Sequence, residues 1–368
     1  MTSVEGSKYM LKKRITLKDI ARETGVHVST VSRALDPVEC KHLTEEVANR
    51  IQSAAKTLGY RPNRIAAGLR TNRTMTVGVI IPDITNVIFP PILRGIESVL
   101  EPLGYASIIV NTDSDPEREE RLIDVLRDRG VDGVIHAAVL RNDPAIAKAA
   151  DDGLPVVTLN RKVDGSPIPS IVNDDDSGIC QMLRHLRDLG HTRIAHISGP
   201  QDLSTGQLRL AAFRRAADDM NVAVNDELIE VASRFDEAEG ARCLLNLLAK
   251  GKPFTAVLCA NDRLALGAIE ALRERSIGCP GQISVTGFND MPFLNLVQPQ
   301  LTTVRIQQFG AGKAAAGVLL QLLNGDSSAP RETILPVELV VRNSTGSAPE
   351  IPASVLPKPN DPAGAIQQ

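Results

Sequence analysis

Several features that would indicate other classes of protein are missing from this chain. Tryptophan is absent and aromatic residues make up 3% of the 368 residues. The five cysteines are odd in number and never stand in CxxC spacing, which argues against a disulfide framework or a zinc ribbon. No apolar run approaches the roughly 18 residues that a membrane span needs, and the charged opening lacks the apolar core of a signal peptide. We therefore expect a cytoplasmic protein without a membrane segment.

The sequence also contains little that indicates catalysis. The stretch "GAGKAAAG" at residues 310–317 looks like a phosphate-binding loop, but it lacks the GKS or GKT ending and lies in a helical apolar pattern. The acidic run "NDDDSG" from Asn173 could suggest a metal site, yet a helix dipole favours acidic residues at its amino end without any ion. His185, His191 and His196 have neither ligand spacing nor a nucleophile beside them. We expect no enzyme activity, no cofactor and no metal.

Charge is distributed unevenly along the chain. Residues 1–74 contain 14 Lys and Arg against 7 Asp and Glu, a net charge of +7, whereas the remainder contains 27 against 37, a net charge of −10. A basic module on an acidic body is expected when a small part of a chain meets phosphates. A merely solvated basic tail is the alternative, so the residue pattern has to decide.

Three short helices are predicted in the basic module. Thr16 can cap a helix over residues 17–24, and Gly25 can end it in a sharp turn. A second helix over residues 28–35 buries its apolar side chains, and a third starts at Thr44. The second helix leaves short side chains and one arginine outside, which suits a helix that must approach base edges closely. This arrangement predicts a helix-turn-helix that reads DNA in the major groove.

The order of the motifs resembles a known family. The stretches "TLKDIARETGVHVSTVSRAL", "LTEEVANRIQSAAKTLGYRPNRIAAGLR" and "VGVIIPDITNVIFPPILRGIE" are similar to those of the LacI/GalR bacterial transcriptional regulators, and "HLRDLGHTRIAHISGP", "ANDRLALGAIEAL" and "QLTTVRI" continue the likeness. One departure is "DPVECKH", which is longer than the family's usual loop. The resemblance implies a ligand-responsive repressor of genes for sugar or other carbon-source use. It would act as a homodimer or a pair of dimers on a pseudo-palindromic operator.

The resemblance also implies which residues contact DNA. Val28 and Ser29 match the positions that choose bases, and the segment from Pro62 to Arg70 resembles a hinge helix. Its Leu69 would wedge between base pairs in the minor groove, although an ordinary buried linker residue is the alternative. The expected DNA contacts are Thr16, Val28, Ser29, Thr30, Ser32, Arg33, Asn63, Arg64, Ala66 and Leu69.

The body reads as short Val/Ile-rich strands that alternate with helices, a pattern typical of parallel sheets covered on both faces. The expected fold is therefore a small all-α DNA-binding domain followed by an α/β, periplasmic-binding-protein-like body of two parallel-sheet subdomains. The resemblance implies three crossovers between these subdomains, near residues 173, 305 and 330. The expected parts are the DNA-binding domain at 1–62, the hinge and linker at 63–74, the body at 75–345 and a disordered tail at 346–368.

Ligands of open parallel sheets bind at the carboxyl ends of the strands, so the polar residues that follow each strand are candidates. Arg209 and Asn261 match ligand-binding positions of the family, and Asn289 stands where the family often has aspartate. The only phenylalanines expected near the ligand are Phe89, Phe288 and Phe293, which favours a polyol over a nucleobase. The predicted effector contacts are Asn86, Phe89, Asn160, Arg161, Arg209, Asn261 and Asn289.

Two other functions share parts of this pattern. A periplasmic sugar-binding protein would share the body, but it would need an export signal and no basic module. A sugar-modifying α/β enzyme would share the alternation, and activity on candidate sugars would reveal it.

Overall fold

The computed structural model describes residues 15–36, 39–60, 73–220, 222 and 224–349. The chain divides into two compact units, Met1–Thr74 and Met75–Gln368, and each is described by itself. Within the described residues, no helix is both long and apolar enough to cross a membrane.

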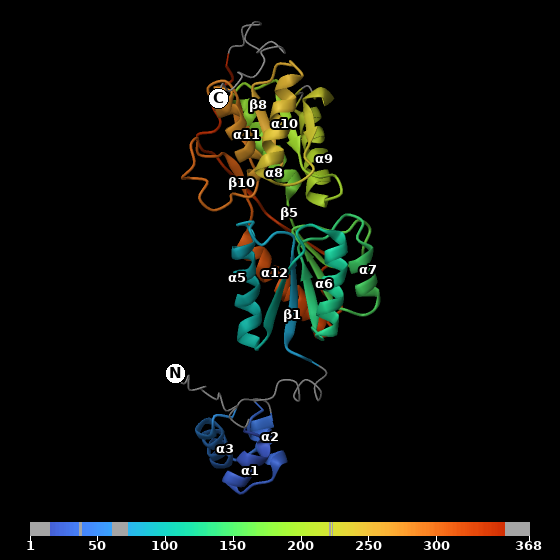
Figure 1. Cartoon of the computed structure of the whole chain (residues 1–368), viewed down its shortest axis with the longest axis vertical. Coiled ribbons are helices and arrows are strands. Elements are labelled where there is room, and N and C mark those ends of the chain that lie inside the picture. The colour runs from blue at the N-terminus through green and yellow to red at the C-terminus, as the bar shows by residue number, and fades with distance from the viewer. Residues whose placement is uncertain (1–14, 37–38, 61–72, 221, 223, 350–368) are drawn as a thin grey trace, which may run out of the picture. The chain divides into compact units, whose positions relative to one another are not determined.

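The amino-terminal unit is the predicted set of short helices around a small core (Figure 1). The carboxylate of Asp19 accepts the backbone N–H of Thr16 at 2.9 Å and its hydroxyl at 2.7 Å, which starts the first helix. Gly25 ends that helix with a positive φ of 67°. The core is formed by Ile20, Ala21, Val31, Ala34, Ile51 and Ala55. The elements are α1 (Leu17–Thr24), α2 (Val28–Ala34), η1 (Glu39–His42) and α3 (Glu45–Leu58).

The amino-terminal half of the body is built on a six-stranded parallel sheet of order β11-β5-β4-β3-β1-β2. Apolar side chains on alternate faces of the strands pack under two helix layers, with α5 and α12 in one core and α6 and α7 in the other (Figure 1). The strands are β1 (Thr76–Ile81), β2 (Ala106–Asn111), β3 (Gly133–His136), β4 (Val156–Leu159), β5 (Ser170–Asn173) and β11 (Glu332–Leu335). The helices are α5 (Phe89–Leu100), η2 (Glu101–Leu103), α6 (Pro116–Asp128), α7 (Pro144–Asp151) and α12 (Gln308–Leu323).

The carboxyl-terminal half repeats the plan with a four-stranded parallel sheet of order β7-β6-β8-β9. Helices α8 and α9 pack together, and α10 and α11 form a second pair. The strands are β6 (Ile194–Ser198), β7 (Ile229–Val231), β8 (Ala256–Cys259) and β9 (Ser284–Thr286), and the helices are α8 (Asp175–Asp188), α9 (Ser204–Asp219), η3 (Asp226–Leu228), α10 (Glu237–Ala249) and α11 (Asp262–Glu274). An antiparallel pair, β10 (Thr303–Arg305) and β12 (Glu338–Val340), completes it.

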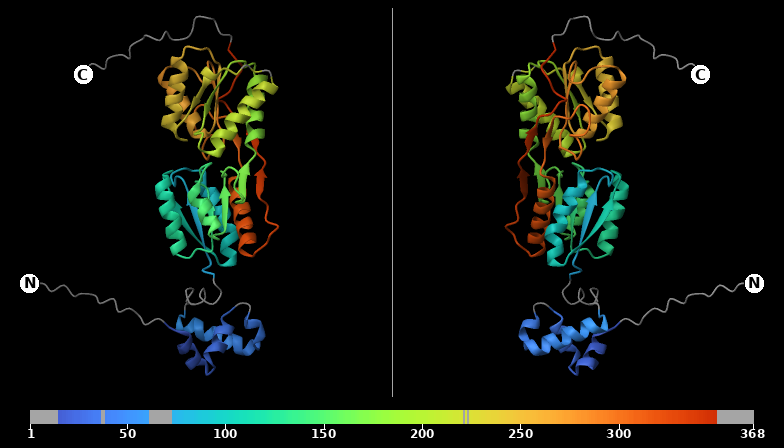
Figure 2. Two further views of the ribbon diagram at one scale, coloured as in Figure 1. Left: turned by 90° about the vertical axis from the view of Figure 1, so that its right-hand side faces the viewer. Right: turned by 90° about the vertical axis from the view of Figure 1, so that its left-hand side faces the viewer.

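The chain crosses between the halves three times, so each half is discontinuous in sequence (Figure 2). The first crossing follows Asn173 and the second follows Arg305. The third was predicted near residue 330, and that position is wrong: β11 pairs with β5 in the first sheet, so the return comes after Leu335. The alternately exposed side chains of this edge strand hid it in the sequence.

The predicted tail begins too early. Ala348 donates its N–H to the carbonyl of Leu189 at 2.8 Å, and the carbonyl of Gly346 lies 3.0 Å from Nε2 of His191. These bonds attach residues 346–349 to the carboxyl-terminal half. Residues 350–368, which the sequence predicts to be disordered, lie outside the described residues.

Candidate functional site

Helix α2 turns a polar face of small side chains outward. Ser29 and Arg33 are exposed, while Val31 and Ala34 of the same helix are buried in the core. Val28 is half-buried and packs against that core, so only part of this side chain is accessible. A face on which most side chains are short lets a helix backbone approach a groove closely.

His27 fixes the hydroxyl group of Ser29. Nδ1 of His27 accepts the backbone N–H of Ser29 at 3.3 Å, so this nitrogen carries no proton. The hydroxyl oxygen of Ser29 lies 2.8 Å from the same nitrogen and must donate to it. The oxygen keeps its lone pairs, so Ser29 faces outward as an acceptor.

The other predicted DNA contacts differ in what the structure describes. Thr16 is exposed, but its hydroxyl donates to Asp19 at the start of α1. Thr30 and Ser32 are half-buried on α2. The hinge residues lie outside the described residues, so their contacts stay predictions from the sequence: Asn63, Arg64, Ala66 and Leu69.

The seven predicted effector contacts all come after strands in the chain. Asn86 and Phe89 follow β1, Asn160 and Arg161 follow β4, and Arg209 lies on the helix after β6. Asn261 follows β8 and Asn289 follows β9. Strands of both halves therefore precede predicted contacts, and a shared site between the halves stays a prediction.

Arg209 is the centre of the carboxyl-terminal part of the site. Its guanidinium is 2% exposed, donates through Nε to Asp175 Oδ1 at 2.8 Å and through Nη1 to the carbonyl of Ala260 at 2.6 Å. The carbon of the guanidinium lies 3.7 Å from the centre of the Phe288 ring, a cation–π distance. Burial raises the pKa of Asp175, and the charge of Arg209 opposes that rise. Arg209 therefore supports the fold, and its contact with an effector stays a prediction.

Asn261 and Asn289 are held by their backbone surroundings. The side chain of Asn261 caps α11 by accepting the N–H of Leu264 at 2.8 Å, which leaves its NH₂ group for other partners. Asn289 donates its backbone N–H to the carbonyl of Val304 at 2.8 Å, and its φ of 123° is unusual for a residue with a side chain. The loop must be constrained from outside to keep this conformation.

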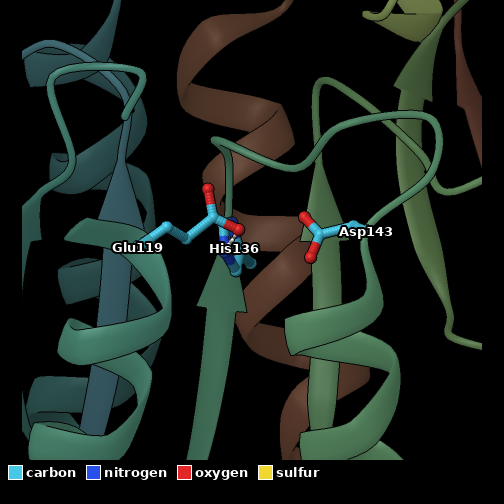
Figure 3. Close-up of side chains that lie close together, drawn as sticks. All are labelled: Glu119, His136 and Asp143. Carbon is cyan, nitrogen blue, oxygen red and sulfur yellow. Dashed lines mark ion pairs between the residues drawn. The ribbon is translucent and has the colours of Figure 1, made fainter. Parts of the chain in front are cut away.

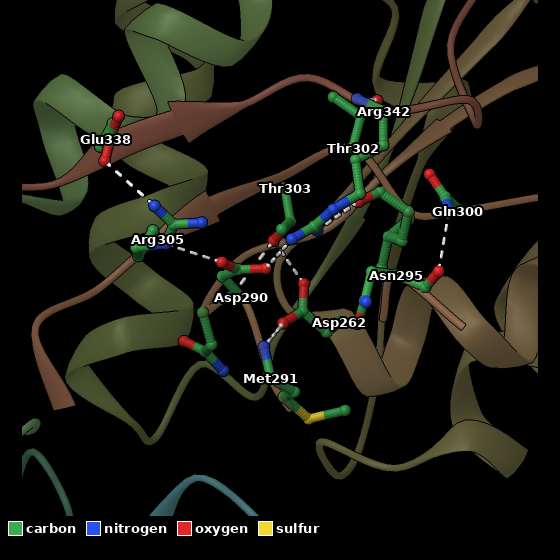
Figure 4. A network of polar contacts seen from close by, with 12 residues as sticks. Asp262, Asp290, Met291, Asn295, Gln300, Thr302, Thr303, Arg305, Glu338 and Arg342 are labelled. Carbon is green, nitrogen blue, oxygen red and sulfur yellow. Dashed lines mark hydrogen bonds and ion pairs between the residues drawn. The ribbon is translucent and has the colours of Figure 1, made fainter. Parts of the chain in front are cut away.

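A buried polar network supplies that constraint (Figure 4). Asp262 accepts the backbone N–H of Met291 at 2.9 Å and the hydroxyl of Thr303 at 2.5 Å. Asp290 accepts Nε of Arg305 at 2.8 Å and Nη2 of Arg342 at 2.6 Å. Burial raises the pKa of Asp262 to about 6. The loop that carries Asn289 is thereby tied to β10, one of the crossing segments.

In the amino-terminal half, Asn160 takes a left-handed φ of 65°. Its Oδ1 accepts a hydrogen bond from Nδ2 of Asn173 at 3.1 Å. Asn86 is half-buried and accepts the N–H of Ile88. Phe89, by contrast, is 2% exposed and belongs to the hydrophobic core. Of the other phenylalanines expected near a ligand, Phe288 lies beneath Arg209 and Phe293 is 68% exposed.

Arg161 is 8% exposed yet poorly satisfied. Its Nη1 donates to the carbonyl of Ala138 at 3.3 Å, and its Nε has no hydrogen-bond partner among the described residues. Burial lowers its pKa to about 10; the charges of Glu119 and Asp202 counteract this, and that of Arg209 adds to it. Arg209 and Asp202 belong to the other half, so Arg161 lies where the halves meet.

A buried cluster next to Arg161 was not predicted. Nε2 of His136, at the end of β3, lies 3.0 Å from Oε1 of Glu119 on α6, and Asp143 approaches from the start of α7 (Figure 3). Burial and the charge of Glu119 raise the pKa of Asp143 to about 6. Burial raises the pKa of Glu119, but His136 and a hydrogen bond with Asp143 lower it further, so that the pKa lies below the ordinary value.

This cluster has the donor types of a metal site but the wrong histidine tautomer. Nδ1 of His136 accepts the N–H of Ala138 at 3.1 Å, so a neutral His136 carries its proton on Nε2, the atom that faces the carboxylates. A metal ligand usually donates through its second nitrogen instead. The nearby cation of Arg161 also opposes a bound cation. The cluster is better explained as a carboxyl pair that shares a proton beside the ligand-facing edge.

Two of the missed residues share one sequence signal. Asp175 precedes the buried Gly178, Ile179 and Met182 on α8, so it lies on that helix's apolar stripe. Glu119 stands in the same relation to the buried residues of α6. An acidic residue in phase with an apolar stripe indicates a buried, partnered charge.

The arrangement of a helix-turn-helix unit and a two-sheet body matches known proteins over almost the whole chain. Residues 16–63 match the bacterial regulatory proteins of the lacI family, and residues 183–345 match a periplasmic binding protein-like domain. The HTH-type transcriptional regulator RegA of Clostridium saccharobutylicum is 33% identical over 331 residues, 90% of this chain and 99% of its own. The chain belongs to the LacI family of bacterial regulatory proteins.

Solved structures of LacI-family regulators agree with this assignment. The Lac repressor dimer bound to operator and the anti-inducer ONPF has a TM-score of 0.81 at 29% identity, and the match covers 91% of this chain and 100% of that one. The complex of the transcriptional regulator CelR with cellobiose has a TM-score of 0.69 at 27% identity, covering 90% and 100%. The predicted fold class and the prediction of a ligand-responsive DNA-binding regulator, rather than an enzyme, are confirmed.

Proposed function

We propose that this regulator is a repressor of genes for the use of a sugar or another carbon source, and that α2 lies in the major groove of a pseudo-palindromic operator. The exposed polar face of α2 supports this docking, and the net charge of +7 on residues 1–74 supplies attraction to phosphates. A symmetric operator calls for a homodimer or a pair of dimers. A protein that binds the chromosome acts in the cytoplasm.

Ser29 is the residue whose base preference the geometry defines best. Its hydroxyl proton is directed at His27, so its oxygen can accept a hydrogen bond but has none to donate. In the major groove, the donors on base edges are the amino groups of adenine and cytosine. We therefore assign Ser29 to one of these bases, and Val28 to apolar contact such as a thymine methyl group.

The effector is a polyhydroxylated molecule held between the two halves of the body. The polar side chains at the ends of strands in both halves support this proposal, and the scarcity of aromatic rings there argues against a stacked nucleobase. Asn261 offers an amide NH₂ group from the carboxyl-terminal half, and Asn86 and Asn160 belong to the amino-terminal half. Phe89 is buried in the core, so it would support the ligand-binding residues without touching the effector.

The proposed route from effector to DNA passes through the hinge. An effector that holds the halves together changes the spacing of the hinge segments in a dimer, which alters how Leu69 is presented to the minor groove. Leu69 lies outside the described residues, so this step rests on the sequence resemblance.

The DNA-binding proposal can be tested by anisotropy titrations with an operator duplex selected from genomic fragments. Arg33→Ala should weaken binding and lower the slope of log affinity against log salt by about one, since one phosphate contact is lost. Arg121→Ala removes the same charge from an exposed position of α6 in the body and should change neither. Salt-insensitive binding by the parent, or equal losses in the two variants, would count against α2 as the DNA-binding surface.

A further inference from the structure

Arg161 has hydrogen-bonding capacity that the protein itself does not use. The side chain is more than nine-tenths buried, and among the described residues its Nε is without a hydrogen-bond partner. Its other contact, from Nη1 to the carbonyl of Ala138, is long at 3.3 Å. A buried guanidinium that lacks a close partner is costly, so its retention indicates a missing acceptor.

The facing arginine differs in this respect. Arg209 is also buried, but Asp175 lies 2.8 Å away and neutralises its charge. Glu119 acts on Arg161 only from a distance, since it lies against His136 and shares a hydrogen bond with Asp143. Of these two buried arginines, Arg161 is therefore the one that can accept a new anionic partner.

We propose that the effector carries a carboxylate group, which accepts a charge-assisted hydrogen bond from Nε of Arg161 where the two halves meet. This inference rests on the proposed function and defines the chemical class of its ligand: a sugar acid or another polyhydroxy acid. The carboxylate would offset the cost of burying the positive charge of Arg161, to which the charge of Arg209 adds.

The surrounding charges favour one negative charge over two. Glu119 and Asp202 are both near enough to act on Arg161, and either would repel a phosphate dianion more strongly than a carboxylate. A pocket of about 480 Å³ opens between the halves, lined by Asp202 from one half and by Leu140, Arg141, Asn142 and Asp164 from the other. None of the seven predicted contacts lines this pocket.

The test compares matched ligands on the full-length protein. Calorimetric titration and thermal unfolding are measured with gluconate against glucose, galacturonate against galactose, and glucose 6-phosphate as the phosphate arm. At least one acid should bind at least about tenfold more tightly than its neutral partner, the scale of one charge-assisted hydrogen bond. Arg161→Met should abolish that preference, and Arg161→Lys should keep part of it because the charge remains.

A ligand-free measurement supports the same test. Because the guanidinium is buried without a close partner, Arg161→Met should unfold at a temperature equal to or above that of the parent. The inference is overturned if no acid binds, or if the neutral sugar or glucose 6-phosphate binds as well as the best acid. It is also overturned if Arg161→Met keeps the preference for the acid. If Arg161→Met does not fold, an acid preference in Arg161→Lys that is as large as that of the parent overturns it.

The same preparations are titrated with operator duplex. Failure of the parent to bind DNA would contradict the proposed function, whereas DNA binding without a preference for acids would contradict only the carboxylate.

Discussion

Replacing Arg209 with methionine removes a buried cation and leaves its partner behind. The side chains of Arg209 and Asp175 are 2% and 7% exposed, so Asp175 would become an uncompensated buried carboxylate. Breaking a buried pair in this way costs about 3–5 kcal/mol. For a body of this size, roughly 2–4 °C is lost per kcal/mol, so the unfolding midpoint should fall by on the order of 10 °C.

Adding Asp175→Asn should restore most of this loss, because the double variant no longer buries a charge without its partner. Arg215→Met is the matched control: Arg215 pairs with Asp176 across the same two helices, α8 and α9, but both side chains are more than half exposed. Such a surface pair is worth about 0–1 kcal/mol, so the midpoint should shift by no more than roughly 4 °C.

Differential scanning calorimetry of the full-length protein measures all three variants. The transition of the amino-terminal unit should stay in place, because it is a separate compact unit. The reasoning is refuted if Arg209→Met unfolds with the parent, or if the double variant is as unstable as the single one.

Two further predictions concern the body. The folded state holds the proton of Asp262 up to a pKa of about 6, against 3.8 for an ordinary aspartate, so the parent should lose stability as the pH rises between those values. Asp262→Asn lacks this dependence. The free energy of unfolding in urea should therefore differ between the parent and the variant by an amount that shrinks by on the order of 3 kcal/mol between pH 4 and pH 7. A difference that does not change with pH would contradict the assignment. In α12, a Cβ on Gly312 would lie 2.0 Å from the carbonyl oxygen of Ile92, whereas one on Gly317 meets nothing within 4 Å. Gly312→Ala should therefore destabilise the body by about 1–3 kcal/mol and Gly317→Ala should stabilise it by about 0.5–1 kcal/mol, and thermal shifts of equal sign would be inconsistent with the close packing of α12 on α5.

The regular elements could be predicted from local patterns. Thr16, Gly25 and Thr44 were predicted at helix ends, and the structure has helix boundaries at all three, although the side chain of Thr44 makes no capping hydrogen bond. The stretch at residues 310–317 was correctly assigned to a helix, because its apolar period outweighed its likeness to a phosphate loop. Strand ends then indicated the candidate effector contacts, which stay predictions.

Contacts between distant segments could not be read in the same way. Asp175 and Arg209 stand on different helices, and no local pattern pairs them. Phe89 follows a strand as a ligand contact would, but the packing of α5 on the sheet buries it. The third crossover was misplaced because pairing of β11 with β5 depends on an edge left open by the first sheet.

The central claim, that α2 reads the bases of an operator, is tested most directly by selection from a random duplex library with the parent protein and with Val28→Ala/Ser29→Ala. The parent should enrich a pseudo-palindromic site, and the variant should lose preference at one symmetric pair of positions while keeping the rest, because base contacts specify and phosphate contacts position. Loss of an adenine or cytosine at that pair would match the acceptor role of Ser29. An identical preferred site for parent and variant, or no enriched site for the parent, would contradict the account.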